Sequence, residues 1–196
     1  MLGSVAAMTV FFVAYFWILN HPFFPLTTIP RTLPDTWVPF SPGALALYVS
    51  LWVYVPLAPA LLATRRELLD YLLAAVVLSA VGFAVFLLWP TTVPKPVAGA
   101  ADAPSLAYLK AVDASGNAFP SLHVAFAVFT AMGLGRILRG LGAGPAAQTA
   151  NWVWCAGIVY STVAIRQHVA LDALAGAVLG AAVAFARRRI QARFRT

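Results

Sequence analysis

Charged residues are scarce in this chain. Only 10% of its 196 residues are charged, and the acids number six. A soluble domain carries about 25% charged residues, so the composition excludes an ordinary soluble protein. With 62% hydrophobic residues and a mean hydropathy of +0.85, the chain is predicted to be an integral membrane protein.

Cysteine is almost absent, and the basic residues are unevenly spread. The single cysteine, Cys155, excludes an intrachain disulfide, and its apolar surroundings in the sequence favour a place in the core. The net charge of +7 does not indicate nucleic-acid binding, because the arginines stand in short clusters between apolar runs. That distribution is typical of membrane-protein loops, so no nucleic-acid partner is expected.

Long apolar runs predict an all-α integral membrane bundle of six transmembrane helices in one domain, residues 1–196. Prolines fill the connector 20–42, which predicts an ordered segment without helix. In the last run, Gly176 and Gly180 would let the helix press closely on its neighbours. The predicted spans are about 2–19, 43–63, 71–89, 119–138, 152–165 and 169–186.

The positions of the basic residues predict the orientation. Nine arginines fall in loops 64–70 and 136–149 and in the C-terminal tail, against four basic residues on the other side. The positive-inside rule makes the arginine-rich side cytoplasmic. We therefore expect a multi-pass protein of the cell membrane with both termini in the cytoplasm and the segments 20–42, 91–118 and around Arg166 outside.

The stretch from Tyr160 to Asp172 places a histidine and an acid inside an apolar segment. His168 and Asp172 are four residues apart, so a helix would put them on one face, where the carboxylate can hold the imidazole. Ionisable groups in a membrane-type segment are costly and by default indicate a functional site. This stretch is therefore the first candidate for chemistry.

Three separate segments bring polar residues to the predicted outer face. Together they supply cations, a hydroxyl group, two histidines and an acid. That set suits phosphoryl transfer, because the transition state needs positive charge and hydrogen-bond donors around the phosphate oxygens. The segments are Pro94-Lys95-Pro96, Pro120-Ser121-Leu122-His123 and Ser161 to Asp172.

Two of these segments resemble motifs of the type 2 phosphatidic acid phosphatase superfamily of lipid phosphatases and lipid phosphotransferases. Its Pro-Ser-Gly-His motif is matched by the segment that ends at His123, and its Ser-Arg-x5-His-x3-Asp motif by the one that ends at Asp172. Leu122 and Thr162 replace the glycine and the arginine of these motifs. The superfamily also has an earlier motif, Lys-x6-Arg-Pro, in which Lys95 replaces the arginine. This motif style is similar to the inositolphosphorylceramide synthase-like branch.

The resemblance implies a role for each site residue. His168 would be the nucleophile that forms a phosphohistidine, Asp172 would orient it, and His123 would protonate the departing alcohol oxygen. No metal, cofactor or protein partner is implied, and the substrate would be a lipid phosphate among membrane lipids. The residues expected to bind the phosphate oxygens are Ser121, Lys95 and Arg166.

Arg166 is predicted to replace the missing arginine of the Ser-Arg-x5-His-x3-Asp motif. If the helix of the fifth span continues through Ile165, then positions 162 and 166 share one face and the long side chain can reach back. The alternative is that Arg166 extends to lipid headgroups. His21 and Asp35 receive no role.

Alternatives remain open for both the reaction and the class of protein. The main prediction is a lipid phosphatase that cleaves a monoester or diphosphate at the outer face, and the second is a phosphotransferase that moves a phosphoalcohol such as phosphoinositol to a lipid acceptor. Two histidines on different helices also fit a b-type haem electron carrier, although Asp172 and Ser121 would then be unexplained. An anion transporter is a further alternative, but the polar residues cluster at helix ends and no internal repeat is visible.

Overall fold

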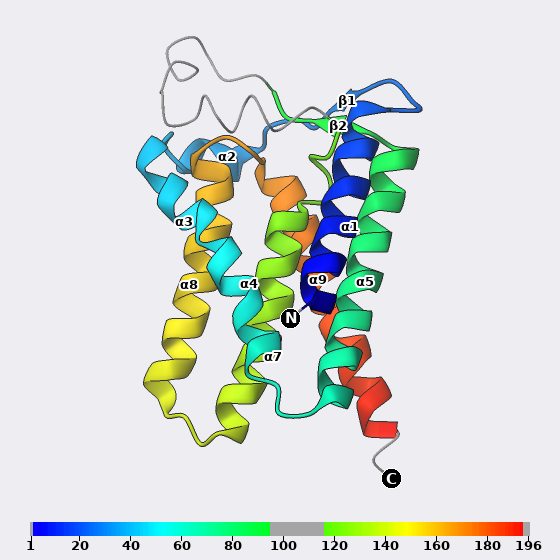
Figure 1. Ribbon diagram of the computed structural model, residues 1–196. Helices are drawn as coiled ribbons and strands as arrows, with labels where there is room; N and C mark the ends of the chain where they lie inside the picture. Colours follow the sequence, from blue (N-terminus) through cyan, green and yellow to red (C-terminus); the bar gives the residue numbers. More distant parts are fainter. Residues whose placement is uncertain (1, 95–115, 194–196) are drawn as a thin grey trace.

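Long helices that run roughly parallel or antiparallel to one another dominate the fold (Figure 1). The computed structural model describes residues 2–94 and 116–193, with side chains from Thr9 onward and up to Ala192. The described chain is mostly helical, as predicted. The long helices are α1 (Leu2–Asn20), α4 (Leu51–Ala60), α5 (Arg65–Leu88), α7 (Leu122–Gly140), α8 (Pro145–Ala164) and α9 (Ala170–Arg193).

Short elements connect the helices at the end of the bundle opposite the C-terminus (Figure 1). Strands β1 and β2 pair in parallel, with Thr27 opposite Thr91. The short elements are β1 (Thr27–Thr28), α2 (Leu33–Trp37), the 3-10 turn η1 (Pro42–Ala44), α3 (Leu45–Val49) and β2 (Thr91–Thr92).

Helix α2 corrects the prediction that the connector 20–42 contains no helix. Its start is stabilised by a capping box, in which the Asp35 carboxylate accepts the backbone N–H of Thr32 at 2.7 Å. Pro34 falls in the first turn, where a helix does not need the missing N–H group. The many prolines therefore limit the length of the helix without preventing it.

Four segments are long and apolar enough to cross a membrane among the residues that the structure describes, so the six predicted spans are not confirmed. Helix α8 is not one of the four, and its first half carries Gln148 and Asn151. In α1 the side chains are described from Thr9 onward, and that part is the apolar stretch Thr9–Asn20. The four segments are Pro42–Ala60, Arg65–Leu88, Leu122–Gly140 and Ala170–Ala192.

Helix ends differ from the predicted spans because hydropathy marks the apolar part of a helix rather than its caps. Helix α5 begins at Arg65 rather than near residue 71, since the Thr64 hydroxyl accepts the N–H of Glu67 at 3.2 Å. Helix α8 begins at Pro145 rather than near 152, with proline in its first turn. Helix α9 continues through the basic tail to Arg193.

The second predicted span is interrupted before its two prolines. Pro56 and Pro59 lie inside α4, and the break falls at Ser50, between α3 and α4. Trp154 of α8 donates its indole N–H to the Ser50 hydroxyl at 2.9 Å. The α3–α4 junction is thus fixed against α8.

Helix α7 lies at the centre of the bundle and packs against α4, α8 and α9. Its closest neighbour is α9, because Gly176 and Gly180 face it. A methyl group built on Gly176 would collide with the carbonyl oxygen of Ser121, and one on Gly180 with that of Ala125. Glycine is therefore required for this approach, as the spacing in the sequence indicates.

Gly180→Ala is expected to destabilise the bundle. Inside a helix, alanine by itself is about 1 kcal/mol more favourable than glycine. Here its methyl group would press on the α7 backbone, and overpacking of this kind costs about 1–3 kcal/mol. The thermal midpoint in detergent should fall, whereas Gly140→Ala, where nothing lies within 4 Å of an added Cβ, should not lower it. Equal midpoints for the two variants would contradict the tight α7–α9 contact.

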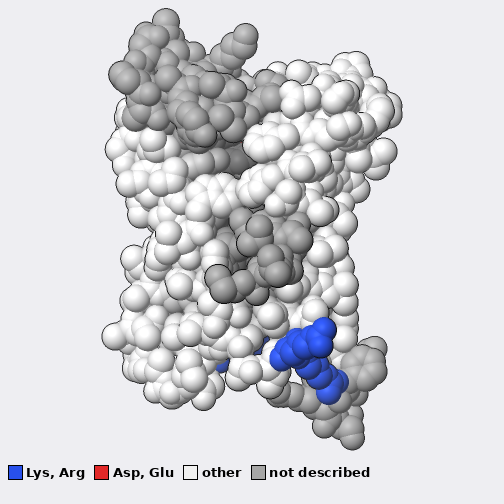
Figure 2. All heavy atoms as spheres, viewed as in Figure 1, with Lys and Arg blue, Asp and Glu red and all other residues white. Residues whose placement is uncertain are grey.

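The arginine-rich segments meet at the end of the bundle that carries the C-terminus. Arg187 binds the Asp70 carboxylate at 2.7 Å, and Gln191 donates to the same oxygen. Arg136 donates to Gln191 at 2.9 Å, which joins α7 to α9. On the face drawn in Figure 2, the visible Lys and Arg atoms of the described residues gather at this end.

Candidate active site

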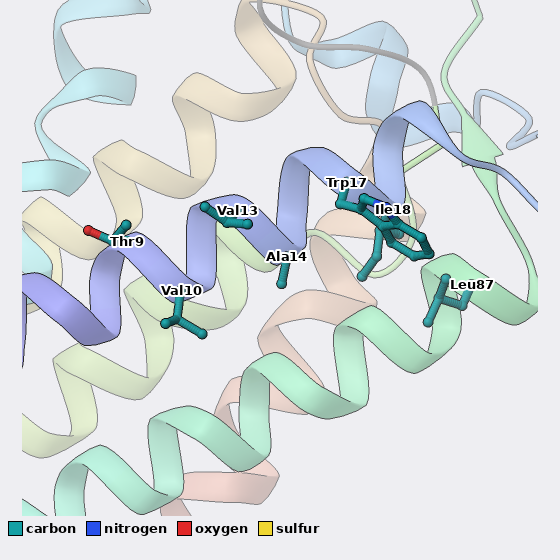
Figure 3. Close-up of a pocket in the computed structure, with 7 residues that line it drawn as sticks. All are labelled: Thr9, Val10, Val13, Ala14, Trp17, Ile18 and Leu87. Atoms are coloured by element: carbon teal, nitrogen blue, oxygen red, sulfur yellow. The ribbon is translucent and has the colours of Figure 1, made fainter.

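The groove between α1 and α5 is apolar (Figure 3). It has a volume of about 410 Å³ and is lined by side chains of α1 and by Leu87, with Thr9 as its polar residue. Among the described residues, none with an ionisable side chain lines it. The chemistry is therefore to be sought elsewhere, where α7, α8 and α9 meet.

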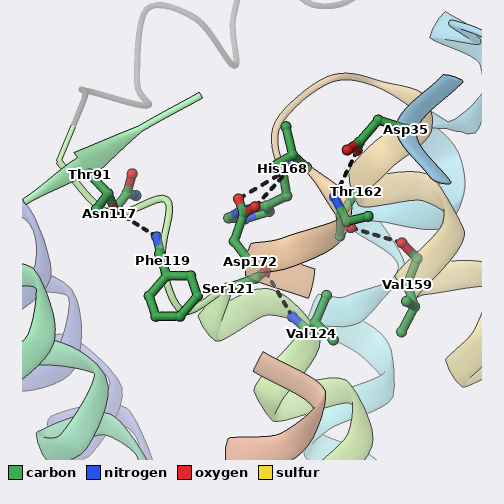
Figure 4. A network of polar contacts seen from close by, with 12 residues as sticks. Asp35, Thr91, Asn117, Phe119, Ser121, Val124, Val159, Thr162, His168 and Asp172 are labelled. Carbon is green, nitrogen blue, oxygen red and sulfur yellow. Dashed lines mark hydrogen bonds and ion pairs between the residues drawn. The ribbon is translucent and has the colours of Figure 1, made fainter. Parts of the chain in front are cut away.

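His168 and Asp172 form the centre of the candidate site (Figure 4). Nδ1–H of His168 donates to Oδ2 of Asp172 at 3.0 Å. Asp172 is fully buried, whereas 10% of the His168 side chain is exposed. Because the carboxylate holds the proton on Nδ1, the lone pair of the ring lies on Nε2.

The predicted contact is present, but not because both residues lie on one helical face. Helix α8 ends at Ala164, and His168 lies in the turn before α9. Arg166 adopts a left-handed backbone conformation with φ 61°, and the N–H groups of Gln167 and His168 donate to the Thr162 carbonyl. The turn thus closes the end of α8 and presents His168 to the start of α9.

Two carboxylates occupy the N-terminus of α9. Asp172 accepts the N–H of Val169 with both oxygens, at 3.1 and 3.2 Å. Asp35, from α2, accepts the N–H of Ala170 at 2.7 Å. Negative charge is stabilised at a helix N-terminus, where free N–H groups point outward. The sequence alone indicated no role for Asp35. The chain has only six acidic residues, and this rarity was the one feature of the sequence that could have pointed to Asp35.

His123 lies in the first turn of α7 and is held by Tyr48 of α3. Nε2–H of His123 donates to the Tyr48 carbonyl at 3.0 Å, and the two rings stack with centroids 3.9 Å apart and planes at 9°. A carbonyl oxygen only accepts, so Nε2 carries a proton and Nδ1 is the nitrogen that can gain or lose one. Tyr48 gave no signal in the sequence, because it is an aromatic residue within an apolar run.

Ser121 joins the starts of α7 and α9. Its hydroxyl caps α7 by accepting the N–H of Val124 at 3.3 Å, and its own N–H donates to the Asp172 carbonyl at 3.0 Å. A capping hydroxyl keeps its proton for donation, so Ser121 can still act on a phosphate oxygen. Pro120 precedes this cap, which corrects the predicted helix start near Phe119.

The premise of the Arg166 prediction is wrong, because α8 ends before Ile165. The Arg166 guanidinium instead donates to the backbone carbonyls of Asp35 at 3.2 Å and Val38 at 2.9 Å. Its role toward phosphate stays a prediction, although its nearest observed partners belong to the connector. Lys95, the other predicted cation, lies outside the described residues.

The segment before α7 is anchored to β2 at the rim of the site. The buried Thr91 hydroxyl accepts the N–H of Phe119 at 2.7 Å, and Asn117 contacts the hydroxyl of Tyr15 in α1. In Figure 4 this segment lies on the side of His168 opposite Asp35. Within the described ranges, no three His, Cys, Asp or Glu side chains group closely enough to hold a metal ion.

Comparison with protein families gives one match. Residues 67–195 match the model of the PAP2 superfamily, and this region contains His123, His168 and Asp172. No curated protein and no solved structure shows significant similarity to the chain. The matched region covers more than half of the chain and confirms the superfamily that the motifs resemble, whereas the inositolphosphorylceramide synthase-like branch stays a prediction. The chain therefore belongs to the PAP2 superfamily, the type 2 phosphatidic acid phosphatases and their relatives.

Proposed function

We propose that this protein is a membrane lipid phosphatase that cleaves a phosphate monoester or diphosphate through a phosphohistidine intermediate. Membership of the PAP2 superfamily supports phosphatase or phosphotransferase activity on phosphate esters. The observation that carries the finer proposal is the His168–Asp172 pair beside the first turn of α7. That turn supplies a second histidine, His123, with an available ring nitrogen.

In the first step, Nε2 of His168 attacks phosphorus and the bond from phosphorus to the lipid oxygen breaks. Asp172 holds the Nδ1 proton and stabilises the positive charge that grows on the ring. His123, protonated on Nδ1, gives that proton to the departing alcohol oxygen. The products are a phosphohistidine and a free lipid alcohol.

In the second step, water attacks the phosphohistidine and the bond between nitrogen and phosphorus breaks. The now neutral Nδ1 of His123 takes a proton from this water, which restores both histidines and releases phosphate. Backbone N–H groups at the start of α7, the Ser121 hydroxyl and the cations Lys95 and Arg166 are proposed to stabilise the phosphate oxygens. With a phosphodiester as donor, the histidine would carry a phosphoalcohol, and its transfer to a lipid acceptor in place of water is the second candidate.

We further propose that the six apolar runs all cross the cell membrane, with both termini in the cytoplasm. In support, the arginine-rich segments lie at one end of the bundle, and the turn between α8 and α9, which contains His168, lies at the other (Figure 1). The positive-inside rule then puts the site at the outer face. Neither the haem nor the transporter alternative gains support from the superfamily.

A lipid panel assayed with and without a chelator tests the reaction. Phosphatidate, phosphatidylglycerophosphate and a polyprenyl diphosphate would each be given to the purified protein, with free phosphate and transferred headgroup measured separately. We expect free phosphate at the same rate with chelator, because histidine rather than metal-bound water is the nucleophile. Transfer without free phosphate would favour the phosphotransferase. Loss of all turnover in chelator, restored by Mg²⁺, would exclude the mechanism above.

A further inference from the structure

We propose that Asp35 is a positioning residue that keeps His168 in its attacking orientation. The inference rests on the proposed function of His168. Asp35 belongs to α2, outside the region that matches the PAP2 superfamily. It touches the start of α9, 135 residues further along the chain.

The Asp35 carboxylate is almost completely buried, with 2% exposure, and is fully used. Oδ1 accepts the N–H of Ala170 at 2.7 Å, and Oδ2 accepts both the N–H and the hydroxyl of Thr32 at 2.7 and 2.8 Å. A buried carboxylate is costly unless such bonds compensate its charge. Asp35 is therefore held in one place and can hold α9 in turn.

The connector binds the turn around His168 on both sides. Before His168, the Ser41 N–H donates to the Ala164 carbonyl at 3.0 Å, and Arg166 donates to the carbonyls of Asp35 and Val38. After His168, Asp35 binds Ala170. The turn that carries the nucleophile is thus fixed at its two ends by one external segment.

Asp35 also leaves Asp172 available to His168. At the start of α9, the N–H groups of Val169 and Ala170 donate to different carboxylates, those of Asp172 and Asp35. If Asp35 were removed, the Ala170 N–H would be buried without a partner, which costs about 1–3 kcal/mol. Among the described residues, Asp172 already binds the N–H of the adjacent Val169, and a shift toward Ala170 would draw it from Nδ1 of His168. Catalysis would then fall through misorientation, with no group that touches the substrate removed.

Kinetics of Asp35→Ala and Asp35→Asn test the proposal on a lipid phosphate that the wild type hydrolyses. Misplacing a reacting group by about 1 Å can cost roughly 100-fold, so we expect Asp35→Ala to lower kcat by about 10- to 100-fold. KM should stay within about twofold, because misorientation acts on the chemical step. Asp35→Asn keeps an oxygen for the Ala170 N–H and should recover most of the loss. Asp70→Asn, at the arginine-rich end, is the matched control and should keep the wild-type kcat.

A second variant removes the donor instead of the acceptor. Ala170 is the first residue of α9, where proline is well tolerated, so Ala170→Pro should fold even if Asp35→Ala does not. It should lower kcat to a similar extent.

A readout without substrate is the rate at which diethyl pyrocarbonate acylates His168, followed by peptide mass spectrometry. Acylation should be slower in Asp35→Ala and Ala170→Pro and unchanged in Asp70→Asn.

The outcomes separate this inference from the proposed function. Wild-type kcat and wild-type acylation of His168 in Asp35→Ala or Ala170→Pro would overturn the positioning role and leave the phosphatase proposal intact. If the wild type releases no phosphate from any lipid, the phosphatase proposal fails, and the acylation rates alone decide whether Asp35 orients His168. An equal rise in KM and fall in kcat, without rescue by asparagine, would also overturn the positioning role.

Discussion

His168→Ala should abolish phosphate release. Without Nε2 no bond to phosphorus can form, and loss of a nucleophile in hydrolases lowers kcat by roughly 10⁶-fold. Asp172→Ala should lose less, roughly 10⁴-fold, because the imidazole remains but is no longer held in one orientation. Phosphatidate labelled in its phosphate would be mixed with each variant in a single turnover. The expected acid-labile phosphohistidine should be absent in His168→Ala and reduced in Asp172→Ala.

His21→Ala is the matched control for this experiment. His21 is exposed at the end of α1, where its ring lies against Trp17 and Nδ1–H donates to the Trp17 carbonyl at 2.8 Å. Its loss should leave turnover unchanged. Turnover of His168→Ala within about tenfold of the wild type would be far from the loss expected for a nucleophile and would rule out the phosphohistidine. Because Asp172 also caps α9, Asp172→Ala should lower the free energy of unfolding by about 0.5–2 kcal/mol, so folding must be checked for each variant.

His123→Ala should separate substrates by their leaving groups. A lipid alkoxide is a poor leaving group and needs a proton, so its release should slow by about 10²- to 10⁴-fold, the usual contribution of a general acid. An activated aryl phosphate leaves without protonation, so the first step with this substrate should be nearly unchanged. The rates of alcohol release from phosphatidate and of p-nitrophenol release from p-nitrophenyl phosphate, each measured in a single turnover with one enzyme preparation, give the comparison.

One result would contradict the role of His123 as the general acid. An equal fall for both substrates would mean that His123 binds or positions the phosphate and does not protonate the leaving group. The hydrogen bond from Nε2 to Tyr48 also has a consequence, because it makes Nδ1 the nitrogen that must face the leaving oxygen. A substrate complex with Nε2 toward the lipid oxygen would require that bond to break.

The sequence located the contact between His168 and Asp172 but not the reason for its geometry. The spacing of His168 and Asp172 predicted a helical contact, whereas the structure makes the contact from a turn into the first turn of α9. Both arrangements bring the residues together, since an N-terminal acid can fold back on the turn that precedes its helix. The helical premise of the Arg166 prediction failed for the same cause, because it required a helix through Ile165.

Contacts between segments far apart in the chain could not be predicted from the sequence. Tyr48 and Asp35 lie 75 and 135 residues from the groups that they hold, and neither carries a periodic signal. The apolar runs, in contrast, predicted the helical bundle well, because burial in lipid requires a long uniform stretch. Helix ends shifted where caps such as Thr64 extend a helix into polar sequence.

The separation of His168 from the arginine-rich end has a consequence for the lipids that the enzyme can use. Helix α9 alone has 24 residues, and at about 1.5 Å per residue it spans roughly 36 Å. This exceeds the hydrocarbon thickness of a bilayer, about 30 Å. A headgroup in the leaflet at the arginine-rich end would therefore lie a full membrane away from His168. Under the proposed function and orientation, each molecule would serve a single leaflet, and lipid phosphates made in the other leaflet would become substrates only after they had crossed the bilayer.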